Sequence, residues 1–392
     1  MNKRILITGM GVVSAIGNDV AGNYDSLRKG KSGICRVQYL DTEHTEFPVG
    51  EVKLSNEELC LALNIPYTDM ESRTDLLGML AVREALQSAG LNDTEHLALI
   101  SGTTVGGMDR TEKFYPDNLN ATILDNHDCG SGTNRIADYF GNFDFATTIS
   151  TACSSALNAI IVGAEMIEAG LKDIIVVGGT ESLSRFHLNG FKSLMILDQN
   201  ICRPFDADRA GLNLGEGAGY IVSGSEDSAK RRKTDVLAEL KGTGNACDAF
   251  HQTASSENGE GAFLAMSKAI AEAGIKAAEI QYVNAHGTGT PNNDACESSA
   301  LMRVFGNKMP TVSSTKMYTG HTTSASGSIE AVYSILSLLH QFVPINIGWT
   351  KADDSCVTPY MNGDCGKIDN VMCNSFGFGG NDSSIILSRY GE

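Results

Sequence analysis

The stretch Thr151-Ala152-Cys153-Ser154-Ser155-Ala156 decides the fold of this chain, because the sequence changes there from a strand pattern to a helix pattern. The preceding residues, Ala146–Thr151, are apolar and β-rich, whereas Ser154–Glu168 carries apolar side chains at helical spacing. Cys153 therefore lies at or beside a helix N-terminus, where unpaired N–H groups and the helix dipole favour a thiolate. Taken alone, the segment is consistent with a buried structural cysteine or with a nucleophile that small neighbours leave accessible.

Strand-like and helix-like segments alternate along the rest of the chain. The predicted strands are Ile5–Thr8, Leu97–Gly102, Ala146–Thr151 and Asp173–Val177. The predicted helices are Asp75–Ala89, Ser154–Glu168 and Gly261–Ala273. This alternation indicates an α/β architecture with mainly parallel or mixed sheets.

A second strand–turn–helix pattern suggests a duplicated fold. Thr311–Ser314 has a strand pattern, Lys316–Thr323 a loop pattern and Ser324–Leu339 a helix pattern, which repeats the arrangement around Cys153. We predict two halves, residues 1–230 and 231–392. The division falls near the basic run Lys230–Lys233, which we interpret as a solvated surface turn.

Composition narrows the class of protein. A chain of 392 residues with 42% apolar residues builds a large core, either as two or three domains or as one large α/β unit. The net charge of −17 argues against a nucleic-acid binder. No apolar run approaches the roughly 18 residues that span a membrane, and the apolar run that stops at Gly9 indicates a buried first strand rather than a signal peptide.

The ten cysteines carry no metal or redox motif. None of them forms a Cys-x-x-Cys pair, which excludes zinc-ribbon and thioredoxin sites. Cysteines scattered in this way are typical of buried thiols in a reducing cytoplasm. The sequence therefore predicts a cytoplasmic protein without structural metal.

Two glycine-rich stretches resemble nucleotide-binding motifs but are incomplete. Gly9-Met10-Gly11-Val12-Val13-Ser14 has Ser14 in place of the third glycine of a dinucleotide fingerprint, and Asp25 is a poor candidate for the ribose-binding acid. We interpret it as a tight strand-to-helix turn. Arg28–Ser32 resembles the end of a P-loop, but Asp25 occupies the place of the required first glycine. The lack of Gly-x-Ser-x-Gly argues against an α/β-hydrolase serine.

Two further segments place titratable side chains between a strand and a helix. His286 follows the strand-like Ile280–Val283 and opens a loop of glycines and threonines. Lys316 and His321 share the loop that ends another strand. Each segment alone is equally consistent with a histidine hydrogen-bonded within its loop, or with a solvated lysine and a capping histidine.

Considered together, the three segments indicate one site. Sheet topology can bring strand ends to a common edge, which is where α/β proteins form ligand sites. A cysteine with two histidines suits acyl transfer together with stabilisation of a carbanion or enolate. Glu330, near the start of the following helix, is placed to neutralise Lys316.

A series of ordered motifs resembles the elongating Cys-His-His β-ketoacyl-(acyl carrier protein) synthases of the thiolase superfamily over nearly the whole chain. The motifs are ITGMGVVSAIG (7–17), TACSSA (151–156), VVGGTES (176–182), CRPFDADRAGLNLGEGAG (202–219), NAHGTGTPNND (284–294), SSTKMYTGH (313–321) and NSFGFGGND (374–382). The resemblance implies a thiolase-like five-layer αβαβα fold of two related halves, with the active site between them.

The resemblance also implies a role for each site residue. Cys153 takes the acyl chain from the carrier thioester, and the backbone N–H groups of Cys153 and Phe378 form an oxyanion hole. His286 and His321 bind the malonyl thioester carbonyl and stabilise the enolate that decarboxylation produces, while Lys316 orients them with Glu330. The remaining substrate contacts implied are Phe376, Gly377, Thr288 and Thr290. The reaction needs no metal or organic cofactor.

The implied partners are an acyl carrier protein and a second synthase subunit, either an identical copy or a paralogue. The family binds its acidic carrier on basic patches, but Met195 stands here where many relatives have arginine. The candidate docking residues are Lys192, Arg203, Arg73 and the run Lys230–Lys233.

Other departures from the family pattern point to a specialised branch. The segment from Met108 to Phe140, which helps line the acyl pocket in the family, is shorter than in the housekeeping enzymes. Asn381 replaces the usual threonine after the paired glycines. These differences favour polyketide or polyene assembly over primary fatty acid synthesis.

Four other functions remain as alternatives. A non-catalytic partner similar to a chain length factor would have lost the nucleophile, whereas Cys153 is present. A malonyl-carrier decarboxylase would use the same residues without condensation. A CoA-primed starter synthase usually has asparagine at the position of His321, and an oxidoreductase rests only on Gly9–Ser14.

Overall fold

The computed structural model describes residues 3–141, 143–362 and 364–391. The strands are β1 (Ile5–Ser14), β2 (Ala98–Gly102), β3 (Phe145–Ile149), β4 (Ile174–Glu181), β5 (Gly217–Ser225), β6 (Ala238–Cys247), β7 (Tyr282–Asn284), β8 (Thr311–Ser313), β9 (Asn370–Gly377) and β10 (Asn381–Ser388). The α-helices are α1 (Val20–Arg28), α2 (Asn56–Leu63), α3 (Arg73–Ser88), α4 (Met108–Phe114), α5 (Ala121–Asp125), α6 (Cys129–Phe140), α7 (Ser155–Glu168), α8 (Arg185–Ser193), α9 (Glu226–Arg232), α10 (Glu260–Ala273), α11 (Pro291–Phe305), α12 (Lys316–Thr319) and α13 (Ser326–His340). The 3₁₀ helices are η1 (Ala277–Glu279), η2 (Thr323–Ala325) and η3 (Phe378–Gly380).

The strand order contains the same pattern twice. The sheet runs β3-β2-β4-β5-β1-β6-β10-β9-β7-β8, so its second half repeats the first in reverse order from the centre. In the first half β1 and β4 pair antiparallel with β5, while β2 pairs parallel with β3 and β4. In the second half β6 and β9 pair antiparallel with β10, while β7 pairs parallel with β8 and β9. The two related halves predicted from the sequence are therefore present.

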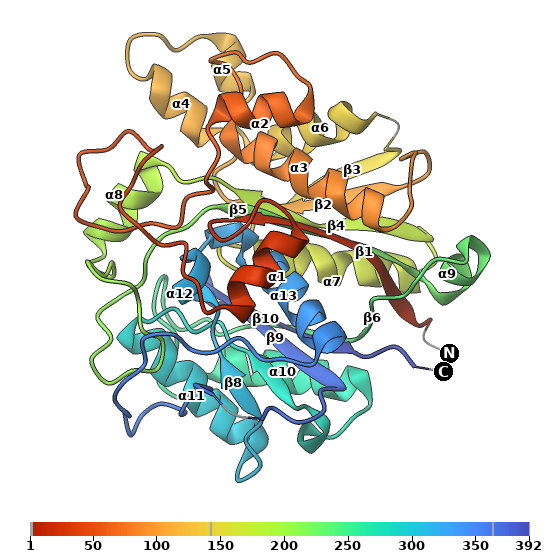
Figure 1. The fold of residues 1–392 in the computed structure, drawn as a ribbon, viewed down its shortest axis with the longest axis vertical. Helices are drawn as coiled ribbons and strands as arrows, with labels where there is room; N and C mark the ends of the chain where they lie inside the picture. The colour runs from red at the N-terminus through yellow and green to blue at the C-terminus, as the bar shows by residue number, and fades with distance from the viewer. Residues whose placement is uncertain (1–2, 142, 363, 392) are drawn as a thin grey trace.

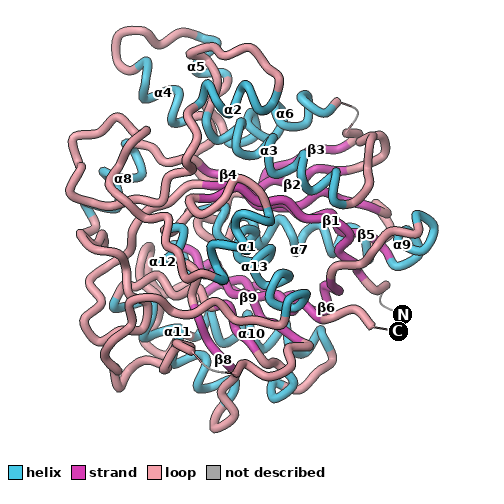
Figure 2. The backbone as a smooth tube through the Cα atoms, in the orientation of Figure 1, coloured by secondary structure: helices cyan, strands magenta, loops and turns pink. Residues whose placement is uncertain are grey.

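The helices complete five layers, which confirms the predicted αβαβα architecture (Figure 1). Helix α3, together with α2 and α6, covers the outer face of the first half-sheet, and α10 with α11 covers the outer face of the second. Helices α7 and α13 lie between the two groups of strands, which Figure 2 shows in magenta above and below them. The halves meet directly where Ile5 to Ile7 of β1 pair with Ala238 to Leu240 of β6. We propose the division after residue 230, which falls within α9.

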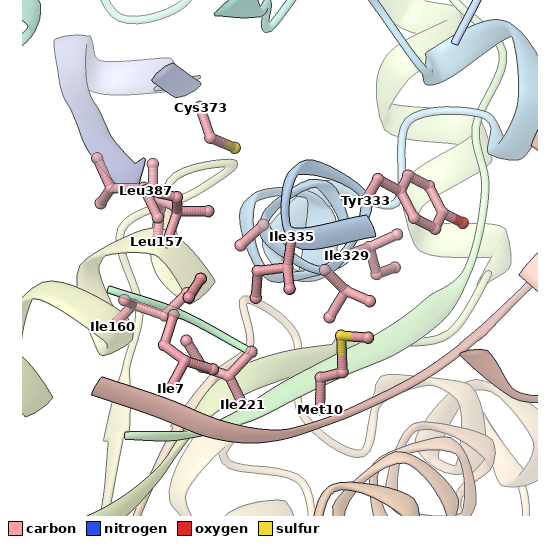
Figure 3. Packing of buried hydrophobic residues seen from close by; sticks show 14 of the residues in the cluster. Ile7, Met10, Leu157, Ile160, Ile221, Ile329, Tyr333, Ile335, Cys373 and Leu387 are labelled. Carbon is pink, nitrogen blue, oxygen red and sulfur yellow. The ribbon is translucent and has the colours of Figure 1, made fainter. Parts of the chain in front are cut away.

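The central layer is packed from both sides. Ile7 and Ile221 of the first half-sheet, Leu157 of α7 and Ile335 of α13 belong to one buried cluster that also includes Leu387 of the second half-sheet (Figure 3). Every residue of α13 from Ser326 to Leu338 is buried. Because only the short helix η2 separates His321 from α13, this packing fixes the segment that carries His321.

The segment Gly9–Ser14 is not the strand-to-helix turn that the sequence suggested, because it is the second part of strand β1. Its glycines permit close contact with α3. A Cβ atom at Gly9 would lie 2.4 Å from the carbonyl oxygen of Ala85, and one at Gly11 would lie 2.1 Å from that of Ala81. The glycine spacing is therefore a requirement of helix–strand packing.

Other local predictions also need correction. The segment Lys316–Thr323 is not a loop throughout, since it contains α12 and the start of η2. The basic run at 230–233 is the last turn of α9 with its C-cap, where basic side chains favour the helix dipole. Of the ten cysteines, Cys60, Cys153, Cys202, Cys296 and Cys373 are buried, four are half-buried and Cys247 is exposed. Within the described part of the chain, no helix has the length and apolar character to cross a membrane.

The contact between β1 and α3 gives a test of the fold. Gly11→Ala should lower the free energy of unfolding by about 1–3 kcal/mol, because the new methyl group meets rigid helix backbone. Chemical denaturation measures this change. Gly190→Ala in α8 is the matched control, since a Cβ there meets no atom within 4 Å and alanine favours a helix. Equal effects of the two substitutions would contradict the packing described for β1.

Candidate active site

The turn that carries Cys153 is held in a strained shape by hydrogen bonds. Ala152 has a φ of +53°, an unusual value for a residue other than glycine. The Ser155 hydroxyl accepts the Thr151 N–H at 2.9 Å and donates to the Ala152 carbonyl at 2.6 Å. Helix α7 starts at Ser155, so Cys153 lies just before its N-cap. Ser375 of β9 donates to the Cys153 carbonyl at 2.9 Å, which ties the turn to the second half.

His286 is positioned by a carboxylate that the sequence analysis missed. Both carboxylate oxygens of Glu297 accept backbone N–H groups, one from His286 at 2.9 Å and the other from Gly287 at 2.8 Å. The side chain of Asn374 also donates to Glu297 at 3.2 Å. Glu297 lies on the buried face of α11 with Asp294 and Leu301. An acidic residue on the buried face of an amphipathic helix was the signal that could have identified it.

His321 lies directly against the thiol of Cys153. Its Nε2 atom is 3.1 Å from Sγ, and its Nδ1 atom is 3.4 Å from the hydroxyl of Ser326 at the start of α13. The backbone N–H of His321 donates to the Asn213 carbonyl at 2.7 Å. These contacts fix the imidazole from both sides.

Lys316 and Glu330 form a buried ion pair behind the two histidines. The distance from Lys316 Nζ to Glu330 Oε1 is 2.6 Å, and the side chains are 1% and 4% exposed. The structure thus places Glu330 where the sequence expected it, against the lysine. Neither side chain reaches the cavity described next.

The predicted residues from both halves meet at one cavity of about 390 Å³. The imidazole rings of His286 and His321 are 5.2 Å apart and nearly perpendicular. The cavity is lined by eight of the ten residues predicted from the sequence: Cys153, His286, His321, Thr288, Thr290, Phe376, Gly377 and Phe378. The Thr288 and Thr290 hydroxyls lie 2.9 Å apart, within hydrogen-bonding distance.

An aromatic pair stands beside the cavity. The ring of Phe378 stacks on Phe191 of α8 with ring centres 5.7 Å apart, and both rings line the cavity. Sequence reasoning did not identify Phe191, because an apolar residue in a short helix has no pattern that separates it from core. Asn381 accepts hydrogen bonds from Ser154 at 2.9 Å and from Asn158 at 2.6 Å. The asparagine that replaces the usual threonine therefore joins α7 to the end of the loop 377–380, the Phe378 loop.

The thiol is less acidic than its place before a helix suggested. Burial raises the pKa of Cys153 to about 11. The backbone N–H groups of Phe378 and Cys153 and the charge of Lys316 oppose this rise but do not reverse it. Desolvation of the thiolate therefore outweighs the stabilisation that the helix N-terminus offers. With a pKa raised to about 11, the thiol is protonated at pH 7.

Both histidines are neutral as well. Burial and the charge of Lys316 hold the pKa of each imidazole well below its usual value. Burial raises the pKa of the Glu330 carboxyl to about 7, although Lys316 opposes the rise. A neutral imidazole donates one hydrogen bond and accepts another, which suits it both to accept a thiol proton and to bind an oxyanion.

A cysteine held against an imidazole at the junction of two α/β halves is the arrangement of an acyl-transferring enzyme. Two family models match the chain: "Beta-ketoacyl synthase, N-terminal domain" over residues 2–228 and "Beta-ketoacyl synthase, C-terminal domain" over residues 237–350. The 3-oxoacyl-(acyl-carrier-protein) synthase 2 of Vibrio cholerae is 34% identical, with 99% of each chain covered.

Solved structures show the same similarity over the whole chain. The ishigamide ketosynthase/chain length factor superposes with a TM-score of 0.92 at 30% identity, with both chains fully covered. A type II polyketide synthase acyl-carrier protein in complex with its ketosynthase gives a TM-score of 0.89 at 25% identity, again with full coverage of both chains. The chain belongs to the β-ketoacyl synthase family, and it is a condensing acyltransferase.

The buried thiol predicts a distinct pH profile for alkylation. The rate at which iodoacetamide modifies Cys153 should rise without a plateau up to pH 9.5, because the thiolate fraction keeps increasing below a pKa of about 11. Peptide mass spectrometry measures this rate separately for each cysteine. The exposed Cys247 serves as the internal control for reagent access. A plateau for Cys153 below pH 8 would show a resting thiolate and contradict the burial argument.

Proposed function

We propose that this enzyme condenses an acyl chain held on Cys153 with a malonyl group presented by an acyl carrier protein, with loss of carbon dioxide. The observation that carries the proposal is the contact of 3.1 Å between Cys153 Sγ and His321 Nε2, with the His286 ring beside it in the same cavity. The product is a 3-oxoacyl thioester of the carrier.

In the first half-reaction Cys153 attacks the carbonyl carbon of the acyl-carrier thioester. Because the thiol is neutral at rest, its proton passes to Nε2 of His321 as the new C–S bond forms. The backbone N–H groups of Phe378 and Cys153 donate towards the sulfur, and we assign them to the oxyanion of the tetrahedral intermediate. The carrier sulfur then leaves and takes the proton, and His321 returns to its neutral form.

In the second half-reaction His286 and His321 bind the thioester carbonyl of malonyl carrier through their N–H groups, which requires that the neutral His321 first shift its remaining proton from Nδ1 to Nε2. Loss of carbon dioxide leaves an enolate whose negative oxygen these two donors stabilise. The enolate carbon attacks the Cys153 thioester, a C–C bond forms and the C–S bond breaks. Lys316, paired with Glu330, keeps the histidines neutral and therefore able to donate.

The cavity is also an argument for an acyl carrier protein as partner, because a carrier must insert its thioester arm to reach the buried sulfur of Cys153. One of the structural neighbours is a ketosynthase in complex with its acyl-carrier protein. Arg73 cannot contribute to docking, because it is buried and forms an ion pair of 2.7 Å with Glu216. Arg203 lies 3.9 Å from the carboxylate of Asp206. The basic candidate that we favour is Lys192 of α8, adjacent to the cavity-lining Phe191.

We also propose that the chain works in a dimer. The edge strand β3 pairs on one side only within the described sheet, and its Phe145 is 41% exposed. The partner is a second copy or a paralogous subunit, and one structural neighbour is a ketosynthase/chain length factor. The ten free cysteines support work in the reducing cytoplasm.

We also propose a specialised polyketide or polyene product, because the segment from Met108 to Phe140 and Asn381 depart from the family pattern.

The central test uses the nucleophile. Cys153→Ala should lose condensation by at least a thousandfold yet retain decarboxylation of malonyl carrier, because both histidines remain. His321→Ala should lose both activities. Mass spectrometry of carrier-bound products measures them together. Cys60→Ala, which changes a buried cysteine outside the cavity, is the control and should remain active.

If Cys153→Ala condensed its substrates at the wild-type rate, Cys153 would not be the nucleophile. A wild-type protein that releases carbon dioxide but forms no 3-oxoacyl carrier would identify a decarboxylase instead. A wild-type protein without either activity would favour a non-catalytic partner subunit.

Carrier docking is tested by charge reversal on α8. Lys192→Glu should raise the KM for an acidic carrier about tenfold at low salt and less at high salt, because salt screens the lost attraction. Lys230→Glu is the matched control. It reverses an exposed lysine on α9, which lies on the opposite side of the molecule from α8 (Figure 1). Equal effects of both substitutions would show a general charge effect and no local docking site.

A further inference from the structure

A pair of acidic side chains lies behind the loop that carries Phe378, and the condensation scheme does not use it. Asp382, at the start of β10, is 3% exposed, and Asp248 directly follows β6. A Cβ atom at Gly261 of α10 would lie 2.2 Å from Asp382 Oδ2 and 2.8 Å from Asp248 Cβ. The two acidic residues therefore approach each other beside the first turn of α10, where only glycine leaves room for them.

Three hydrogen-bond donors converge on the side chain of Asp248. One oxygen accepts the Ser256 N–H at 2.7 Å, and the other accepts the Ser256 hydroxyl at 2.7 Å and the Gly261 N–H at 3.3 Å. Asp248 thereby anchors both ends of the loop between residues 248 and 256.

This loop is joined to the loop of Phe378 by backbone hydrogen bonds. The Asp248 N–H donates to the Gly380 carbonyl at 2.8 Å, and the Gly379 N–H donates to the Gln252 carbonyl at 2.8 Å. The carboxyl group of Asp382 accepts the N–H of Gly377. Phe378, whose own N–H points at the Cys153 sulfur, thus lies between anchored residues on both sides.

The titratable groups that act on Asp382 are acidic. Burial, followed by the charges of Asp248 and Glu297, raises the pKa of Asp382 to about 8. Cys296 of α11 and Glu257 of the neighbouring loop also face this cluster. Across the part of the chain that the structure describes, neither Asp382 nor Asp248 forms an ion pair with lysine or arginine. At pH 7 the Asp382 carboxyl is therefore uncharged.

We propose that Asp382 is a positioning residue for the condensation: its uncharged carboxyl group holds the Phe378 loop against the Cys153 cavity, and its ionisation beside Asp248 loosens that loop. The Gly377 N–H favours the ionised carboxylate, but ionisation also places two like charges at one buried point, and this repulsion is the larger of the two effects on Asp382. The loop that both acids anchor is the part that can move apart. The inference rests on the proposed role of the Phe378 N–H in the oxyanion hole. Under this inference the loss of activity at high pH depends on the movement of this loop as well as on the titration of the Cys153 thiol.

The experiment compares the wild-type protein with Asp382→Asn, which keeps the shape of the side chain and cannot ionise. The ratio of kcat/KM, variant over wild type, should be near one at pH 7. It should rise to about ten at pH 9, because one pH unit above a pKa of about 8 leaves roughly a tenth of the groups neutral. Taking a ratio at each pH cancels the titration of Cys153 and of the carrier. Glu57→Gln, which changes an exposed acid on α2 in the other half of the chain, is the control and should give a flat ratio.

Hydrogen–deuterium exchange supplies a readout that does not need activity. Above pH 8, peptides covering residues 371–380 should exchange faster in the wild type than in Asp382→Asn, and at pH 7 they should exchange equally. The melting temperature of the variant relative to wild type should rise between pH 4 and 8, because the folded wild type binds its proton more tightly than the unfolded chain does. A flat activity ratio with equal exchange at pH 9 overturns the inference and leaves the proposed function intact. A wild-type protein without condensing activity overturns the proposed function, and the exchange result then decides the role of Asp382 alone.

Discussion

The burial of the contact between Cys153 and His321 is the constraint on which the rest of this structure depends. The cysteine comes from the first half of the chain and the histidine from the second, so the contact exists only when α7 and α13 pack together between the half-sheets. Removing water from this junction raises the pKa of the thiol and lowers the pKa of the imidazoles. The resting site is therefore a pair of neutral groups that exchange a proton only when a substrate arrives.

The same desolvation explains the acidic residues around the site. Glu297 and Glu330 both have a pKa raised to about 7 by burial, and each is held by donors that offset part of this rise. Glu297 shapes the backbone at His286, while Glu330 balances the buried charge of Lys316. The site thus obtains its geometry from buried acidic groups held either by a cation or by N–H donors, which offsets the high cost of an isolated buried charge.

The sequence predicted the layers and most of the cavity, because these depend on local patterns. The strand-to-helix change at Cys153 and its echo at His321 gave the duplicated architecture, and family motifs indicated eight residues that line the cavity. The interpretation of Gly9–Ser14 as a strand-to-helix turn was wrong, because the glycines are required by the packing of β1 on α3, which local sequence does not show. The docking role of Arg73 failed for the same reason, because it depends on burial and on a partner distant in the sequence, Glu216. The burial that raises the pKa of Cys153 likewise comes from packing that local sequence patterns do not show.

The central claim is that the two halves build one site in which Cys153 alone receives the acyl chain. The most direct measurement is peptide mass spectrometry after the enzyme is mixed with an acyl-carrier thioester and quenched before malonyl carrier is added. We expect one acyl group per chain, located on Cys153 and formed much more slowly in His321→Ala. An acyl group on another of the ten cysteines, or rapid acylation of Cys153 without the histidine, would contradict it.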